Sequence, residues 1–338
     1  METFLQPRSE VENRGPVLLI VNGTVTGIAA IIVGLRAISR IFIVKKFGLD
    51  DWTMVAAMIF AIGNVVVAGF GVKYGTGKHK WDLDEADVLP TAKLRYVTHI
   101  IYTVITGLTK VSICLLYLRL FPNIRIISLG TIAFVTAMSI AFVFATIFQC
   151  SPVDAIFDEK KYKHYSCFDS IPFWYATAAL SLATDIWILL LPLKTVLELH
   201  LRTRKRLIIA SLLSLGAFAC IASIMRMVYI VKLYKSPDPS WDTFGVSVCS
   251  GIEVAVAITA ASIPAIKPIV NRLFPRLFPS SAGVSQSASH QVYPSGSRIE
   301  SARRRFQPRD IIPLSLFTMK EGSDTGDDES TKAIRHAN

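Results

Sequence analysis

Seven long apolar stretches constrain this chain more than any other feature of its sequence. They occupy residues 17–39, 52–72, 96–118, 126–150, 171–193, 207–231 and 243–266. A helix of about 20 apolar residues crosses the hydrocarbon core of a bilayer, because its backbone polar groups are satisfied within the segment. The sequence therefore predicts an all-α integral membrane protein, a seven-transmembrane helix bundle over residues 17–270 whose first partner is the lipid bilayer.

Composition supports the membrane class. Only 18% of the 338 residues are charged and 52% are hydrophobic, whereas a soluble domain carries roughly 25% charged residues. This excludes an ordinary soluble fold, and we expect no nucleic-acid partner despite the net charge of +11. Residues 271–338 are rich in Ser, Gly and charge, which predicts a disordered C-terminal tail.

Loop charges predict the orientation in the membrane. One set of loops has a net charge of +9: 40–51, 119–125, 194–206 and 271–278. The other set has a net charge of −1: 1–16, 73–95, 151–170 and 232–242. Both sets contain twelve Lys and Arg residues, so the split comes from acidic residues, which contribute little to topology. The charge split favours an extracellular N-terminus, residues 1–16, and a cytoplasmic C-terminus. The membrane expected for this orientation is the plasma membrane.

Two cysteines bracket one of the loops expected to be extracellular. Cys150 and Cys167 flank residues 151–166, whereas the other three cysteines lie inside apolar stretches. A disulfide persists in an oxidising compartment, so a bond between these two would agree with an extracellular loop. The sequence alone leaves the pairing open.

Besides Arg36 near the end of the first stretch, four charged residues interrupt the apolar stretches: Lys110, Asp185, Arg226 and Glu253. A charge at membrane depth costs about 2.5–3.5 kcal/mol to insert and marks a paired or functional position. Lys110 and Asp185 each lie 14 residues after the start of their stretch, about 21 Å deep at 1.5 Å per residue. The matched depth favours an ion pair that fixes helix packing over an ion or ligand site.

The other two charges are not matched by the same depth counting. Glu253 lies near the midplane without a partner at its own depth, and we expect a carboxylic acid that is hydrogen-bonded to a neighbouring helix. Arg226 is placed near the outer edge and Arg36 at the inner end of the first stretch. Both arginines are expected to extend their head groups to the membrane surface.

Short motifs occur in order along the apolar stretches. The residues that carry them are Asp50, Asp51 and Trp52 at the start of the second stretch, Gly75, Gly77 and His79 after it, and Tyr117 and Arg119 at the end of the third. Together they resemble the fungal rhodopsin-domain integral membrane protein family, which is related to Pth11-like receptor-type proteins and to the membrane protein of the satratoxin toxin cluster. The resemblance covers about residues 17–270. It implies a seven-helix protein similar to G-protein-coupled receptors, and some members are encoded in secondary-metabolite clusters.

Cofactor and metal sites are not expected. A retinal Schiff base needs a shielded lysine on the last helix, but Lys267 lies at the membrane exit and Lys110 is on the third stretch. His79, Asp82 and Asp84 are residue types that can bind a metal, but no second His or Cys lies nearby at the spacing of metal ligands. A hydrogen-bonded loop is therefore the preferred interpretation of this segment.

Three functions remain open from the sequence. A receptor-like protein would sense a small molecule or surface cue; its G-protein partner rests on analogy with the helix count alone. The alternatives are a non-catalytic accessory membrane protein of a secondary-metabolite pathway and a small-molecule transporter. An enzyme is not expected, because the chain carries none of the common catalytic motifs.

Overall fold

A computed structural model describes residues 12–157, 164–168, 170–198 and 203–273. Seven helices in this part of the chain are long and apolar enough to cross a membrane, which confirms the predicted fold class. Most of the N-terminal segment 1–16 and of the predicted disordered tail 271–338 lies outside the described residues, so both assignments stay predictions.

Most helices extend beyond the predicted apolar stretches, whereas the fourth ends at Ile147, three residues before the predicted end at residue 150. Their bounds are α1 Gly15–Ile38, α2 Leu49–Lys73, α3 Glu85–Leu120, α4 Arg125–Ile147, α5 Ser170–Glu198, α6 Thr203–Lys235 and α7 Pro239–Leu273. A π-helix, η1 (Ser39–Val44), continues α1, and three short 3-10 helices follow, η2 (Lys80–Asp82), η3 (Pro122–Ile124) and η4 (Val153–Ile156). The largest extension is at α3, which begins with Glu85 and Asp87 in its first turn. Acidic side chains there stabilise the positive end of the helix dipole, so the helix starts well before its apolar part.

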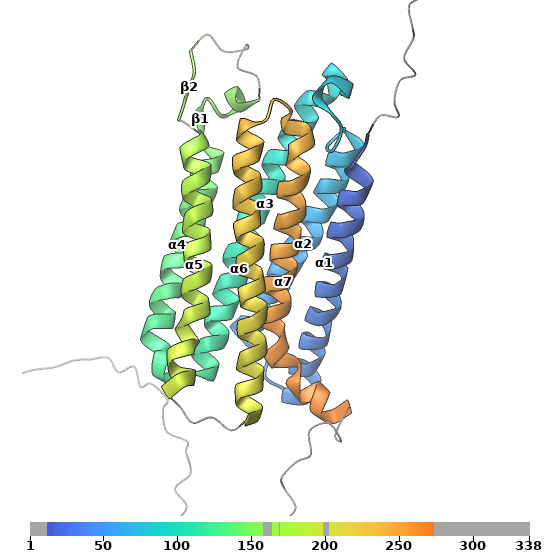
Figure 1. Cartoon of the computed structure of the whole chain (residues 1–338). Coiled ribbons are helices and arrows are strands. Elements are labelled where there is room, and N and C mark those ends of the chain that lie inside the picture. Colours follow the sequence, from blue (N-terminus) through green and yellow to red (C-terminus); the bar gives the residue numbers. More distant parts are fainter. Residues whose placement is uncertain (1–11, 158–163, 169, 199–202, 274–338) are drawn as a thin grey trace, which may run out of the picture. The chain divides into compact units, whose positions relative to one another are not determined.

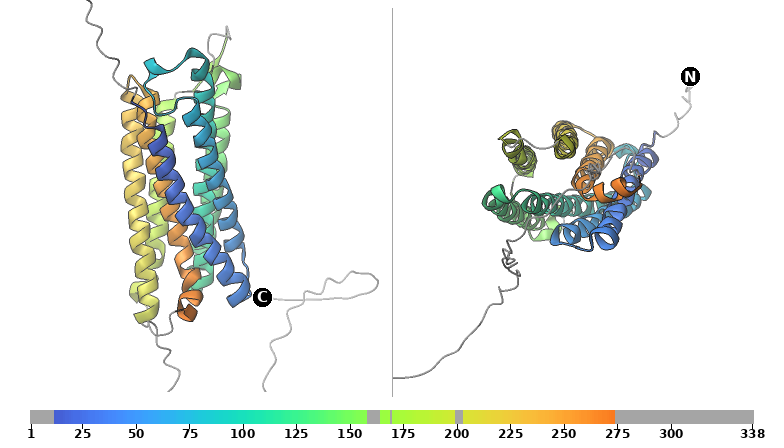
Figure 2. Two further views of the ribbon diagram at one scale, coloured as in Figure 1. Left: turned by 90° about the vertical axis from the view of Figure 1, so that its right-hand side faces the viewer. Right: turned by 90° about the horizontal axis from the view of Figure 1, so that it is seen from below.

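Successive helices run up and down around a ring, and α7 closes the ring between α6 and α1 (Figures 1 and 2). Helix α3 packs against α2, α4, α5 and α7. It therefore provides the central surface against which charged side chains of other helices can be buried.

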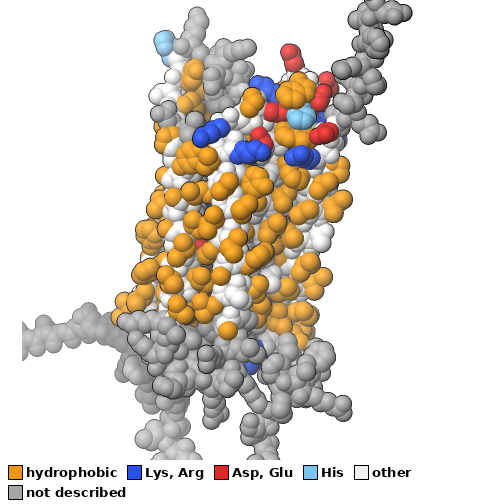
Figure 3. Space-filling view, in the orientation of Figure 1, with side chains coloured by type: hydrophobic (Ala, Val, Ile, Leu, Met, Phe, Trp, Pro, Cys, Tyr) orange, Lys and Arg blue, Asp and Glu red, His pale blue; other side chains and the backbone are white. Residues whose placement is uncertain are grey.

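Two apolar clusters hold α3 in this position. One joins α1, α2, α3 and α7 through Ala29, Met54, Ile105, Val254 and Ile258, among others. The second joins α3, α4 and α5 and includes Cys114, Val135 and Ile188. Large apolar side chains also point outward from most helices, such as Ile20, Ile59 and Ile126, and hydrophobic side chains coat the side of the bundle in Figure 3. That surface fits a lipid environment.

A two-stranded hairpin follows α4, with β1 (Cys150–Ser151) antiparallel to β2 (Ser166–Cys167). Cys150 and Cys167 are directly opposed and form a disulfide. We call this end of the bundle the hairpin end; charged side chains and a histidine gather there in Figure 3. That the hairpin end faces the outside stays a prediction.

Candidate functional site

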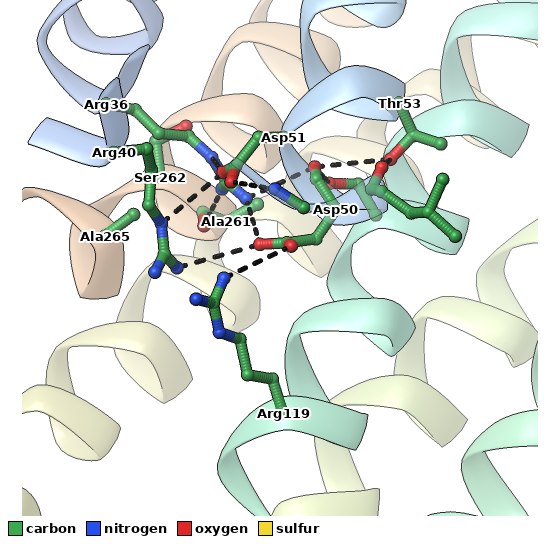
Figure 4. Close-up of polar contacts among 12 residues, drawn as sticks. Arg36, Arg40, Asp50, Asp51, Thr53, Arg119, Ala261, Ser262 and Ala265 are labelled. Carbon is green, nitrogen blue, oxygen red and sulfur yellow. Dashed lines mark hydrogen bonds and ion pairs between the residues drawn. The ribbon is translucent and has the colours of Figure 1, made fainter. Parts of the chain in front are cut away.

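Three arginines and two aspartates meet at the end of the bundle opposite the hairpin (Figure 4). We call them the arginine–aspartate cluster: Arg36, Arg40, Asp50, Asp51 and Arg119. They come from α1, η1, the first turn of α2 and the last turn of α3. The cluster carries one more positive than negative charge.

Among the arginines of the arginine–aspartate cluster, Arg36 makes the shortest contacts with the carboxylates. Its Nε lies 2.8 Å from Asp51 Oδ1, and its Nη2 lies 2.8 Å from Asp50 Oδ2. Its Nη1 donates to the carbonyl of Ala261 on α7 at 2.7 Å. Arg40 and Arg119 are more distant, with their closest carboxylate oxygens 3.5 and 3.6 Å away. One guanidinium thus links α1, α2 and α7.

The prediction that Arg36 extends to the membrane surface is wrong. Its exposed fraction is 1%. The short segment 45–48 turns the chain back after η1, with Lys45 at a left-handed φ of 52°, and so brings Asp50 and Asp51 against α1. Lipid-depth counting treats each helix alone and misses a partner supplied by the next helix.

The second group of buried charges lies in the middle of the bundle. Lys110 Nζ on α3 lies 3.0 Å from Asp185 Oδ1 on α5. These are the two residues whose matched depths predicted an ion pair. The ammonium also donates to the Thr184 hydroxyl at 2.8 Å and to the Ser181 carbonyl at 2.9 Å. A lysine has three N–H donors, so its hydrogen bonds are satisfied within the protein.

Glu253 and Arg226 pair with each other, contrary to the sequence interpretation. Arg226 Nε on α6 is 3.0 Å from Glu253 Oε2 on α7, and each residue is 4% exposed. The other carboxylate oxygen, Oε1, accepts hydrogen bonds from the hydroxyls of Tyr102 at 2.9 Å and Ser223 at 2.8 Å. The arginine also lies over the Tyr102 ring, with 4.7 Å from its guanidinium carbon to the ring centroid.

Ser223 connects the two ion pairs. Its hydroxyl lies 3.3 Å from Asp185 Oδ2 and 2.8 Å from Glu253 Oε1. We call the connected set the central polar network: Tyr102, Lys110, Asp185, Ser223, Arg226 and Glu253. It contains two cations and two carboxylates, and it joins α3, α5, α6 and α7. A displacement at one of its pairs can therefore reach all four helices.

A cavity of about 450 Å³ lies between the central polar network and the hairpin end. Arg226, Tyr102 and His99 line it beside the network, and Gln149, Ile156 and Phe157 line it beside the hairpin. A volume of this size falls in the range of small-molecule sites, about 300–1,000 Å³. A second cavity of about 30 Å³ reaches Lys110 and shares Arg226 and Tyr102 with the first.

The cavity wall combines aromatic rings with polar groups. Trp174 packs edge-on against His99, with ring centroids 3.7 Å apart, and Phe157 packs against Tyr96 at 5.4 Å. Asn22 and Asn64 also line the cavity. The side-chain carbonyl oxygens of both are buried without a hydrogen-bond partner among the described residues, and that of Asn22 packs against Gly251 on α7. Buried polar groups are normally satisfied, so Asn64 marks a place on the wall where a donor would fit.

The loop after α2 forms part of the hairpin end, as a hydrogen-bonded segment. His79 Nδ1 lies 2.7 Å from Asp238 Oδ2, and its ring stacks between Trp81 and Trp241, at 4.6 and 3.9 Å between centroids. Gly75 and Gly77 have φ of 103° and 94°, which L-residues rarely adopt. This loop ties α2 to the α6–α7 turn beside the cavity.

The remaining motif residues lie outside the cavity. Trp52 is exposed next to Phe47, with ring centroids 5.3 Å apart, and Tyr117 is buried in the apolar cluster of α3, α4 and α5. Sequence reasoning did not select Tyr102, Ser223 or Asn64. The available signal was a polar side chain inside an apolar stretch, which it applied only to charges.

The fold and these buried groups define a polytopic seven-helix membrane protein with a ligand-sized cavity above an intramembrane charge network. The chain belongs to the fungal rhodopsin domain family, whose model matches residues 35–272.

Relatives carry both receptor and gene-cluster names. A "SAT4 family membrane protein" of Emericella nidulans is 32% identical over 60% of this chain and 52% of its own length. "Receptor GIN3" of Arthrobotrys oligospora is 25% identical over 78% of this chain and 64% of its own length. "Polyenoic acids biosynthesis gene cluster protein Ba17b" of Metarhizium anisopliae is 24% identical over 80% and 77%. The chain thus spans about half of the first relative, and no solved structure matches it.

Proposed function

We propose that this membrane protein is a receptor-like sensor that binds a small molecule in the cavity at the hairpin end. The observation that carries the proposal is the position of the cavity directly on the central polar network, with Arg226 and Tyr102 belonging to both. A ligand there touches a residue whose partner lies on another helix. The name of one relative, a receptor, supports the same class.

Signal transfer in this proposal uses the shared residues. Arg226 on α6 and Glu253 on α7 form an ion pair, with 3.0 Å between Nε and Oε2. A ligand that draws Arg226 away from Glu253 therefore weakens a contact between these two helices. Ser223 transmits the change to Asp185 and so to α5 and α3. A ligand shifts a conformational equilibrium only through a difference in affinity between the two states. The Arg226–Glu253 pair supplies a contact that can differ.

The sidedness is part of the proposal. A disulfide in the hairpin fits an oxidising compartment, and the charge split between the two sets of loops favours the same orientation. The cavity would then be near the outer face and the arginine–aspartate cluster near the cytoplasm. Such an arrangement suits a plasma-membrane protein that reads an external cue.

An accessory role in secondary metabolism is the second candidate, favoured by a specific observation. Two relatives are named as proteins of biosynthetic gene clusters, Ba17b and "Fugralins biosynthesis cluster protein 2" of Gibberella zeae, which is 29% identical over 60% of this chain and 53% of its own length. An accessory protein needs no ligand-dependent change in shape. A transporter is the third alternative, in which the cavity would be a transit site.

A deletion strain distinguishes the three functions. Wild-type and deletion strains are exposed to small-molecule fractions, and both early transcript changes and metabolite yield are measured. A receptor predicts a rapid transcript response to at least one fraction that is absent from the deletion strain. An unchanged transcript response with altered metabolite yield would instead favour the accessory role, and altered accumulation of a fraction component inside cells would favour transport.

A further inference from the structure

The charge of the cavity wall indicates the ligand class, an inference that rests on the proposed function. Arg95 and Arg226 line the cavity, and no Asp or Glu belongs to its lining among the residues that the structure describes. Glu253 lies behind Arg226, where it contacts Nε. A ligand entering the cavity therefore meets cationic groups and no carboxylate.

Arg226 has the geometry of an anion-binding residue. A guanidinium is a planar fork whose donors match a carboxylate with two parallel hydrogen bonds. The contact with Glu253 uses Nε, so the two terminal nitrogens remain for a ligand. At 4% exposure the group is shielded from bulk water, and low local dielectric strengthens its attraction for an anion.

The rest of the wall specifies the other parts of the ligand. Tyr96, Phe157 and Trp174 offer aromatic faces and edges to an apolar body. The unpartnered carbonyl of Asn64 would accept a hydrogen bond from a donor on the ligand, such as a hydroxyl or an amide N–H.

We propose that the cavity binds an amphipathic organic acid, with the carboxylate on Arg226, an apolar or aromatic body against Trp174 and Phe157, and a hydroxyl or amide donor at Asn64. The bound carboxylate competes with Glu253 for the guanidinium. Because the central polar network has no net charge without ligand, a third carboxylate disturbs the balance of the Arg226–Glu253 pair. The same acid chemistry is found in water-soluble metabolites and in fatty acids from the membrane.

The test measures thermal unfolding of the full chain in phosphatidylcholine nanodiscs. Three probes share one body and differ in the head group: 6-phenylhexanoate, its methyl ester and 6-phenylhexylamine. We expect a concentration-dependent rise in melting temperature with the acid, at least ten times weaker binding of the ester, and no rise with the amine. Oleate and its methyl ester form the membrane-source arm; a preference for oleate over 6-phenylhexanoate would assign the acid to lipid. Equal binding of acid and ester in both arms, or binding of the amine alone, overturns the proposal.

A paired substitution tests the role of Arg226. Arg226→Gln with Glu253→Gln removes both charges together, so no uncompensated charge is buried, and it should abolish the preference for acid over ester. The matched control is Lys232→Gln with Asp242→Asn, which removes another pair between α6 and α7, 3.5 Å apart with a largely exposed lysine. A retained acid preference in the first variant assigns the carboxylate elsewhere and contradicts the assignment. If that variant does not accumulate, the head-group series on the unaltered protein decides.

The two proposals can fail separately. An acid preference in nanodiscs without any transcript response in the strain test would support the proposed ligand class and contradict the proposed sensor function. A transcript response that depends on this protein, together with equal binding of acid and ester, would contradict the proposed ligand class but not the proposed sensor function.

Discussion

Lys110 and Asp185 show what a buried charge requires at the residue scale. Their 3.0 Å contact is supported by Ser181 and Thr184, which satisfy the rest of the ammonium. Removing one partner leaves an uncompensated charge and costs about 3–5 kcal/mol, whereas removing both is much less costly. We therefore expect Lys110→Met and Asp185→Leu each to lower the apparent melting temperature in detergent, and the double variant to recover much of the loss. Additive losses in the double variant would show that the two side chains do not interact.

Asp51 is the most buried acid of the arginine–aspartate cluster, with 1% exposure. It accepts from Arg36 at 2.8 Å and from the Gly48 N–H at 3.1 Å. Asp51→Asn leaves three arginines with one carboxylate, and we expect a loss of stability of about 3–5 kcal/mol, measured as a fall in detergent thermostability. Asp84→Asn, at an exposed carboxylate of the hairpin end, is the control; equal melting temperatures in the two variants would contradict this role of Asp51.

Depth counting predicted one ion pair and missed the other for a physical reason. Arg226 was counted from the far end of its stretch and Glu253 from residue 243. In the structure a short turn joins α6, which ends at Lys235, to α7, which begins at Pro239. Arg226 lies nine residues before the end of α6, and Glu253 lies 14 residues after the start of α7. At 1.5 Å per residue, the two are about 14 and 21 Å from the turn. Two long side chains bridge a difference of this size, which counting positions along the helices alone had treated as a mismatch.

At the scale of elements, close packing of α3 against α4 depends on a glycine. A Cβ on Gly107 would lie 2.6 Å from Ser139 Oγ and 3.0 Å from Ser139 Cβ, whereas a Cβ on Gly130 of α4 would meet nothing within 4 Å. Overpacking of this kind typically costs about 1–3 kcal/mol. Gly107→Ala should lower the detergent melting temperature, and Gly130→Ala should leave it unchanged or slightly raised. A Gly107→Ala protein as stable as the Gly130→Ala protein would mean that Ser139 makes room for the methyl group at no cost, and would contradict this role of the glycine.

The seven helices were predictable because a single property, about 20 apolar residues in a row, decides each of them. Their ends were less predictable. The first turns of α3 and α7 contain Glu85, Asp87 and Asp242, which hydropathy counts as loop but which stabilise a helix start. The cavity was not predictable, because its lining comes from residues as distant in sequence as Asn22, Trp174 and Ser250.

At the scale of the whole molecule, the orientation of the bundle is open to a direct test. A glycosylation sequon inserted between residues 157 and 164 should receive a glycan, because we expect the hairpin to lie outside. The same sequon inserted between residues 45 and 48, or in the region 280–338, should not. A glycan in either of the latter positions, with none in the hairpin, would reverse the proposed orientation.

The central claim is that the cavity at the hairpin end carries the function. Asn64 lines it with an unpartnered carbonyl and is not part of the central polar network, so Asn64→Leu changes the cavity and leaves the buried charges in place. Ile62→Leu, at a lipid-facing position of the same helix, is the matched control. The decisive measurement is the ligand-dependent transcript profile of deletion strains that express each variant at the wild-type membrane level. The account predicts that Asn64→Leu reproduces the deletion profile and Ile62→Leu the wild-type profile; a wild-type profile from Asn64→Leu would contradict it.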